Sequence, residues 1–369
     1  MFKDTFRHKV ERLLALADVK IGGSRPWDMH VHKDELYTRV LLGGSLALGQ
    51  SYMDGWWDCS KLDEFFYRIM RAQLDTMVKS WPWYFDAVKA KLFNLQKQSR
   101  AYEIGRHHYD IGNNLYQCML DKRMIYSCGN WETASILDEA QEAKLTLVCE
   151  KLDLQPGMRV LDIGCGWGGT AKFAAERYRV EVVGITVSEQ QTRFGKELCR
   201  GLPIDIRLQD YRDIEETFDR IISIGMFEHV GHKNYRTFVH IVRGLLKDKG
   251  LFLLQTIGGN ESTTKTDPWI ERYIFPNSML PSPRQIGAAI EGVFVSEDWH
   301  TFAADYDRTL MHWYRNFHEG WHSLKEDYDE RFYRMWKYYL LSSAGAFRSR
   351  SNQLWQLLLS PKAGKGGRS

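Results

Sequence analysis

Apolar residues recur with two different periods along the chain of 369 residues, and the period changes near position 136. Before that position, residues 6–21 and 61–78 repeat apolar positions at helical spacing, so each range predicts an amphipathic helix. The stretch between them, residues 40–60, is apolar and rich in glycine. This half of the pattern predicts a small, mainly helical domain, to which we assign residues 1–88.

After position 136, short apolar runs alternate with longer amphipathic ranges. The short runs predict strands over residues 157–164, 180–187, 204–210, 218–226 and 251–258. The longer ranges predict helices over residues 136–154, 170–178, 188–201 and 235–250. Strands that alternate with helices form βαβ units. The pattern therefore predicts an α/β fold with a parallel, doubly wound sheet.

A glycine-rich loop follows the first predicted strand, in the sequence VLDIGCGWGG. Gly164, Gly166 and Gly168 allow a tight turn and a close approach of the backbone to a ligand. A dinucleotide site has an acidic residue about 20 residues further on, but here no acid follows the second strand until Glu189. Asp162, inside the loop, suits a cationic ligand such as the methionine end of S-adenosylmethionine. The loop therefore favours S-adenosylmethionine over NAD.

Polar residues that follow the next two predicted strands complete this site. Thr186, Ser188 and Gln191 offer hydroxyl and amide groups to a ribose, and Asp210 and Tyr211 stand where an adenine would lie. Ordinary capping of strand ends is the alternative interpretation of these residues.

A carboxylate ends the fourth predicted strand, in the sequence IISIGMFEHVG. Ligands of α/β sheets bind outside the carboxyl ends of the strands, so Glu228 is a candidate for handling a proton or a charge. The alternative is a carboxylate that a helix N-terminus stabilises. For His229 and His232 we expect a surface or structural role.

Composition narrows the class of protein. Hydrophobic residues make up 44% of the chain and its formal charge is only +3, so we expect a globular protein that does not bind nucleic acid. The six cysteines have no C-x-x-C spacing, which predicts free thiols in a reducing cytoplasm and neither disulfides nor a metal site. No apolar stretch approaches the roughly 18 residues that would span a bilayer, so we expect any membrane contact to be peripheral.

Residues 89–106 are basic and contain apolar side chains between the cations. Such a segment can lie on an anionic membrane surface, and a solvated linker between domains explains it equally well. The cations that would contact lipid are Lys89, Lys91, Lys97 and Arg100. The last residues, 361–369, are basic and rich in glycine, which predicts a flexible tail.

Several long motifs lie along the chain: GSLALGQSYMDGWW, HYDIGNNLY, YSCGNW, VLDIGCGWGG, GMFEHVG, DPWIERYIFP and DWHTFAADYDRTL. These motifs resemble those of the cyclopropane-fatty-acyl-phospholipid synthase family and, over the catalytic part only, those of the mycolic-acid cyclopropane synthases. The resemblance implies a Rossmann-like S-adenosylmethionine-dependent methyltransferase domain, residues 107–360, after a small helical domain that helps with lipid. It also implies transfer of a methylene group to the cis double bond of phospholipid acyl chains, a homodimer, and a location at the inner face of the cell membrane.

The resemblance further implies site residues. Tyr126 and Ser127 match the family segment that closes over the methionine part of the cofactor. Bicarbonate would act as the base, and the residues that match its binding site are Cys128, Glu228, Gln255, Ile257 and Tyr306. Ile257 can contribute only through its backbone, and Cys128 is expected to do the same. Glu228 would accept the bicarbonate O–H, because two unshared negative charges would repel each other.

Two positions depart from the family pattern. Gln255 stands where well-known members carry histidine, and because an amide does not titrate, a proton relay through this position is in doubt. Ser343 stands where some relatives have cysteine, which excludes a covalent cysteine mechanism there. Two other readings stay open: an enzyme that adds a methyl branch through the same carbocation, and a non-catalytic lipid-binding or cofactor-sensing protein.

Overall fold

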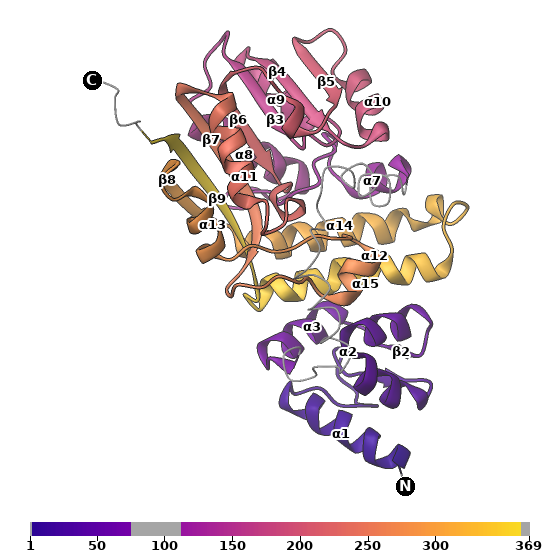
Figure 1. Ribbon diagram of the computed structural model, residues 1–369. Helices are drawn as coiled ribbons and strands as arrows, with labels where there is room; N and C mark the ends of the chain where they lie inside the picture. The colour runs from indigo at the N-terminus through magenta and orange to yellow at the C-terminus, as the bar shows by residue number, and fades with distance from the viewer. Residues whose placement is uncertain (1, 75–111, 363–369) are drawn as a thin grey trace. The chain divides into compact units, whose positions relative to one another are not determined.

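The computed structural model describes residues 2–74 and 112–362 (Figure 1). These residues form two compact units: unit 1 contains residues 2–74, 266–276 and 306–352, and unit 2 contains the remainder. The predicted basic segment 89–106 and both of its boundaries lie outside the described residues. Of the predicted tail, Pro361 ends a strand and residues 363–369 lie outside the description.

Unit 1 is mainly helical. Its elements are α1 (Phe2–Leu16), β1 (His30–Val31), α2 (Glu35–Met53), β2 (Trp57–Asp58), α3 (Leu62–Arg71), α12 (Pro268–Tyr273), α15 (Glu330–Arg348) and most of α14 (Ala303–Leu324). Both predicted ranges form a helix, but α1 ends at Leu16 and not at residue 21, and α3 ends at Arg71 and not at residue 78. The glycine-rich stretch between them also forms a helix, α2, with a kink at Gly44, where φ is 57°.

The core of unit 1 is built from aromatic rings. Trp57 contacts Tyr52 and Phe65, with ring centroids 5.1 and 5.2 Å apart, and Tyr338 of α15 contacts Phe66 at 5.0 Å. At Gly345, also in α15, an added Cβ would lie 2.7 Å from the backbone nitrogen of Tyr67. The aromatic content of the chain thus serves, in large part, to fill this core.

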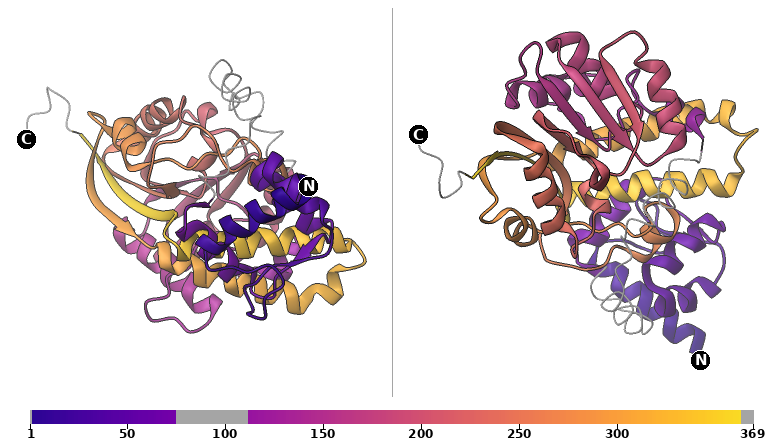
Figure 2. Two further views of the ribbon diagram at one scale, coloured as in Figure 1. Left: turned by 90° about the horizontal axis from the view of Figure 1, so that it is seen from below. Right: turned by 45° about the horizontal axis from the view of Figure 1, so that its top comes forward.

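Unit 2 contains a sheet of seven described strands in the order β5-β4-β3-β6-β7-β9-β8 (Figure 1, Figure 2). The strands are β3 (Arg159–Ile163), β4 (Glu181–Thr186), β5 (Ile204–Leu208), β6 (Phe218–Ile224), β7 (Leu246–Gly259), β8 (Phe294–Thr301) and β9 (Asn352–Pro361). The helices and turns are α7 (Asn113–Met119), α8 (Leu137–Lys151), α9 (Gly169–Tyr178), α10 (Glu189–Leu198), η1 (Tyr211–Asp213), η2 (Phe227–His229), α11 (Tyr235–Leu245) and α13 (Pro283–Ile290).

Each face of the sheet has its own apolar core. Alternate residues of a strand point to opposite faces: in β3, Leu161 joins the core beneath α11 and α13, while Val160 joins the core beneath α8 and α9. Strands β3 to β7 run parallel. Their carboxyl ends therefore meet along one edge of the sheet, where an α/β fold binds ligands. The predicted α/β fold is confirmed.

Two details differ from the prediction. The sheet is not wholly parallel, because β8 and β9 pair antiparallel at its edge. The helix predicted over residues 235–250 ends at Leu245, since Leu246 already pairs with Phe218 in the sheet. Strand pairing has overridden helix propensity there. No helix in the described ranges is long and apolar enough to cross a membrane.

Candidate functional site

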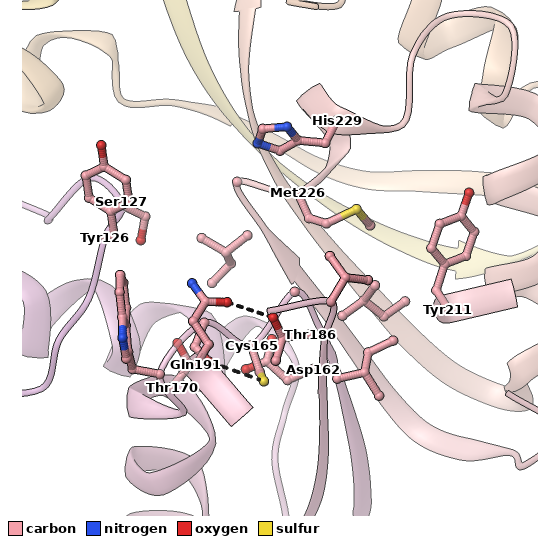
Figure 3. A pocket seen from close by; sticks show the side chains of 18 of the residues that line it. Tyr126, Ser127, Asp162, Cys165, Thr170, Thr186, Gln191, Tyr211, Met226 and His229 are labelled. Carbon is pink, nitrogen blue, oxygen red and sulfur yellow. Dashed lines mark hydrogen bonds between the residues drawn. The ribbon is translucent and has the colours of Figure 1, made fainter. Parts of the chain in front are cut away.

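A cavity of about 180 Å³ lies above the glycine-rich loop between β3 and α9 (Figure 3). A single water needs only about 10–15 Å³, so this cavity is shaped for a larger ligand. Gly164 and Gly166 line it with φ values of 82° and 56°, which favour glycine. At Gly164 an added Cβ would also lie 2.9 Å from the Met226 side chain, so glycine keeps the cavity open.

Most of the residues predicted to bind the cofactor line this cavity. The lining includes Tyr126, Ser127, Asp162, Gly164, Gly166, Thr186, Gln191, Asp210 and Tyr211. Two predicted residues lie outside it. Gly168 is the N-cap of α9, and Ser188 is the N-cap of α10, where its hydroxyl accepts a hydrogen bond from the Gln191 backbone N–H. For Ser188, the alternative interpretation of a cap describes its contacts.

Asp162 lies at the end of β3 with its side chain buried. Burial raises the pKa of this carboxyl to about 7, and the Lys144 ammonium opposes the shift. Its Oδ2 atom has no hydrogen-bond partner within residues 2–74 and 112–362. An unpaired, buried acceptor is costly unless a ligand satisfies it, so Asp162 fits a cationic ligand group.

The polar groups near β4 already form some hydrogen bonds with one another. The Thr186 hydroxyl donates to Gln191 Oε1 at 2.7 Å and accepts from the Ser188 backbone N–H at 3.2 Å. This pair fixes the orientation of the Gln191 side chain, whose amide nitrogen points into the cavity (Figure 3). Gln191 is thus better placed than Thr186 to donate to a ligand hydroxyl.

At the end of β5, Asp210 forms an ion pair that the sequence reasoning did not include. Both oxygens of this carboxylate accept hydrogen bonds from the Arg212 guanidinium, each at 2.7 Å. Arg212 also lines the cavity. Tyr211 and Met226 present their side chains to the same end of the cavity (Figure 3). An aromatic ring and a thioether suit a flat, apolar group such as a nucleobase.

Glu228 lies in η2, one short turn after β6, and its side chain is buried. Its Oε1 accepts a hydrogen bond from the Ile257 backbone N–H at 2.6 Å, while its Oε2 has no hydrogen-bond partner in the described part of the chain. Burial raises the pKa of Glu228 to about 7, against the effect of the Ile257 hydrogen bond. The group can therefore take up or release a proton near neutral pH.

Gln255 precedes Ile257 by two positions in β7, so both side chains lie on the same face of the sheet. Gln255 Oε1 accepts a hydrogen bond from Gln356 Nε2 of β9 at 3.1 Å. The buried Gln255 Nε2 has no partner among the residues described. An unpaired amide donor and a carboxyl group that can share a proton are both groups that suit a small oxyanion such as bicarbonate.

Residues 96–357 match the model of a family described as mycolic acid cyclopropane synthetase. The chain belongs to this family. Over 361 residues it is 51% identical to the cyclopropane-fatty-acyl-phospholipid synthase of Escherichia coli (strain K12), covering 97% of this chain and 94% of that protein. A probable fatty acid methyltransferase of Pseudomonas putida is 36% identical, with 68% of this chain and 67% of that protein covered.

Solved structures of cyclopropane synthases share the fold. The cyclopropane synthase MmaA2 from Mycobacterium tuberculosis is 31% identical with a TM-score of 0.66, covering 70% of this chain and 97% of that one. The mycolic acid cyclopropane synthase CmaA1, complexed with SAH and CTAB, is 32% identical with a TM-score of 0.66 and the same coverage. These comparisons confirm the family that the motifs indicated.

Cys128 and Tyr306 are the other two residues that the resemblance assigned to bicarbonate binding. Cys128 is buried, follows Ser127 of the cavity lining, and its thiol donates to the Gly129 carbonyl at 3.1 Å. Tyr306 belongs to unit 1, where its ring stacks on Phe347 with centroids 4.5 Å apart. The role of both residues in bicarbonate binding stays a prediction.

Some lining residues escaped the sequence reasoning. His229, for which we expected a surface or structural role, lines the cavity, and burial lowers its pKa to about 4. Its position next to Glu228 at a strand end was the available signal. Two residues of α8, Gln141 and Lys144, support the lining from behind by hydrogen bonds to Ser127. The local sequence pattern did not mark these two residues, because α8 contacts the segment around Ser127 only in the folded protein.

Proposed function

We propose that this protein transfers a methylene group from S-adenosylmethionine to the cis double bond of unsaturated phospholipid acyl chains and so forms a cyclopropane ring. One observation carries the proposal. The cavity above the glycine-rich loop, Glu228 and Gln255 lie at the ends of neighbouring strands of one unit. Asp162 in the cavity lining, Glu228 and Gln255 each have a buried polar atom that lacks a partner among the described residues. The relatives named above supply the chemistry that such a pair of sites would serve.

S-adenosylmethionine, when bound, supplies an electrophilic sulfonium methyl group. Asp162 would accept from the ammonium of its amino-acid end, and the Gly164 and Gly166 backbone would allow close approach. The Gln191 amide would donate to the ribose, and Tyr211 and Met226 would contact the adenine. These residues hold the cofactor in one orientation. For two oriented reactants, that effect is worth roughly 7–11 kcal/mol of the barrier.

An alkene is a weak nucleophile, and its methylation leaves a carbocation on the acyl chain. A proton must then leave the new methyl group for the ring to close. A strongly nucleophilic side chain close by would itself be alkylated, so a small, bound base suits this step better. Bicarbonate, when bound, supplies such a base. Gln255 would donate to it, and Glu228 would accept its O–H, with its own position fixed by the Ile257 N–H.

The remaining parts of the proposal concern the lipid. We propose that the protein works as a homodimer at the inner face of the cell membrane, bound peripherally. The helical domain and the basic segment 89–106 would dock on the bilayer, and an acyl chain would leave it to reach the catalytic domain. The 51% identity to a phospholipid-modifying synthase over nearly the whole chain supports this substrate class.

Methyl incorporation tests the proposal directly. The purified protein is incubated with unsaturated phospholipid vesicles and methyl-labelled S-adenosylmethionine, with and without added bicarbonate. We expect label in the lipid and a higher rate with bicarbonate. An absence of label when bicarbonate is present would contradict the proposal and favour a non-catalytic protein that senses lipid or cofactor. Equal rates with and without bicarbonate would contradict only the role of the base.

A second candidate product is a methyl-branched chain. It shares the carbocation and differs in which proton is lost. The names of two relatives favour it: the probable fatty acid methyltransferase of Pseudomonas putida and, at 34% identity, sphingolipid C9-methyltransferase A of Emericella nidulans. A ring and a methylated alkene have the same mass, so NMR of the extracted lipid must distinguish them. We expect cyclopropane methylene signals and no new vinyl or branch-methyl signals.

A further inference from the structure

Two side chains of α8 hold Ser127, which lines the cavity. Gln141 Nε2 donates to the Ser127 carbonyl oxygen at 2.7 Å, and Lys144 Nζ donates to the Ser127 hydroxyl oxygen at 3.1 Å. The two residues are three positions apart and therefore lie on the same face of the helix. Both are buried, Lys144 with 3% of its surface exposed. The backbone and the hydroxyl of Ser127 are thus fixed at the same time.

The chemistry of the ammonium group decides the orientation of the Ser127 hydroxyl. An ammonium has three donors and no acceptor, so Ser127 Oγ must be the acceptor of this hydrogen bond. Its own proton then points away from Lys144 and is available to a second acceptor. Because Ser127 lines the cavity (Figure 3), Lys144 makes this serine a hydrogen-bond donor toward a ligand.

The charges around Lys144 explain how a buried amine is tolerated. The Asp121 and Asp162 carboxyl groups both favour the charged amine, although burial lowers its pKa to about 8. Asp121 also accepts hydrogen bonds from the backbone N–H groups of Arg123 and Ile125, on the segment that leads to the cavity. A buried charge is costly to keep. An apolar residue would serve packing alone at a lower cost, so a lysine at this position indicates a role beyond packing.

We propose that Lys144 is a positioning residue that directs the Ser127 hydroxyl to the carboxylate of a zwitterionic amino-acid ligand. This inference rests on the proposed function, in which that ligand is the methionine end of the cofactor. Asp162 would receive the ammonium of the ligand. In the described lining the cationic side chain is Arg212, and Asp210 already binds it. Ser127 is then in a position to donate to the carboxylate, and the neighbouring ammonium increases its donor strength.

Binding of two ligands to Lys144→Met tests the proposal without measuring turnover. Methionine keeps the length of the side chain and removes its charge and its donors. S-adenosylhomocysteine carries the amino-acid end, whereas 5′-methylthioadenosine lacks it. By calorimetry we expect the substitution to weaken S-adenosylhomocysteine about 10-fold to 100-fold and to leave methylthioadenosine within about twofold of the wild type. In a Ser127→Ala background, the same substitution should add little.

The possible outcomes distinguish a failure of this inference from a failure of the proposed function. Equal weakening of both ligands means that Lys144 acts only on the fold, and unchanged affinity for both means that it does not act on the ligand; either result overturns the inference. If the wild type binds neither ligand, the proposed function fails as well. Where Lys144→Met melts below the assay temperature, Lys144→Leu takes its place, because it also removes the donors, with selective loss of S-adenosylhomocysteine again required.

Discussion

At the scale of single residues, the carboxyl group of Glu228 makes the free energy of unfolding depend on pH. Its pKa is about 7 in the folded protein, against an ordinary value of 4.5, because it is buried. The folded state therefore binds more protons than the unfolded state between these two pH values, and the free energy of unfolding falls as the pH rises through this window. The full effect is on the order of 3 kcal/mol.

Glu228→Gln should remove this dependence. We expect the variant to gain stability relative to the wild type as the pH rises from 4.5 to 7, because the wild type alone must then ionise a buried carboxyl group. Urea unfolding at several pH values, without ligand, measures the difference between the two free energies of unfolding. Asp162 titrates in both proteins, so its effect cancels. A difference that stays constant across this range would contradict the burial argument.

In the proposed bicarbonate site, Gln255 would act through its orientation and not through titration, because an amide does not titrate. Its Nε2 is directed by the hydrogen bond that its Oε1 accepts from Gln356. We expect Gln255→Leu to raise the bicarbonate concentration needed for half-maximal methyl transfer about 10-fold to 100-fold, because the donor is lost. Gln356→Leu should have a smaller effect of the same sign. Gln255→His keeps a donor and should change the rate only a few-fold; a large gain would show that a proton relay is missing here.

Single residues of the site could be predicted to different degrees. Asp162 lies at the end of an apolar strand and Glu228 one short turn after another, so the local pattern marked them. Gln356 and Lys144 lie far along the chain from the residues that they contact and sit among apolar neighbours, where a polar residue has no local signature. Arg212 was missed because the ion pair with Asp210 is a matter of side-chain direction, which sequence spacing does not determine.

At the scale of elements, the start of α9 is tightly packed against the segment that precedes Tyr126. A Cβ added at Gly169 would lie 2.1 Å from the Arg123 carbonyl oxygen. We expect Gly169→Ala to lower the free energy of unfolding by about 1–3 kcal/mol, because backbone must move to admit the methyl group. The affinity for S-adenosylhomocysteine should fall as well, since the displaced segment lines the cavity.

Gly244 provides a matched control for this prediction. It is the second-to-last residue of α11, is exposed, and an added Cβ would meet nothing within 4 Å. Gly244→Ala should therefore raise the free energy of unfolding through helix propensity, by at most about 0.5–1 kcal/mol. Urea denaturation of both variants is the measurement. If both substitutions stabilise the protein, α9 is not packed as tightly as the structure shows.

The elements that could be predicted are those whose pattern reflects their surroundings. The strands β3, β4 and β6 are largely buried on both faces and read as apolar runs between helices, which indicated the α/β fold. By contrast, β8 is largely exposed and carries little pattern. Its antiparallel pairing with β9 depends on contacts distant in sequence, and no local period reports the direction of a neighbouring strand.

At the scale of the whole molecule, each unit is built from several segments that are separate in the sequence. Residues 266–276 and 306–352 group with the amino-terminal residues, and not with the strands that flank them in sequence. A pattern read along the chain cannot show this, because periodicity reports the shape of an element and not its partner. The helical domain predicted from residues 1–88 therefore described only the amino-terminal part of unit 1.

The proposed membrane docking would involve the whole chain, and we expect it to depend on the basic segment 89–106. Each lysine or arginine near an anionic surface contributes about 1 kcal/mol. Replacing Lys89, Lys91, Lys97 and Arg100 by glutamine should weaken binding to phosphatidylglycerol-containing vesicles by up to roughly a thousandfold at low salt. The loss should shrink as the ionic strength rises, because salt screens these charges. Vesicle sedimentation over a range of salt concentrations measures it.

A control must remove the same charge from elsewhere, because net charge alone attracts a protein to an anionic surface. Four cations of unit 2 have side chains that are 62% to 83% exposed: Lys122, Arg177, Arg193 and Arg200. Their replacement by glutamine lowers the net charge by the same four units. If this control variant loses as much affinity as the segment variant, binding follows net charge and the segment has no special part in it. A selective loss in the segment variant means that its cations meet the lipid, and the reading of residues 89–106 as a mere linker is then excluded.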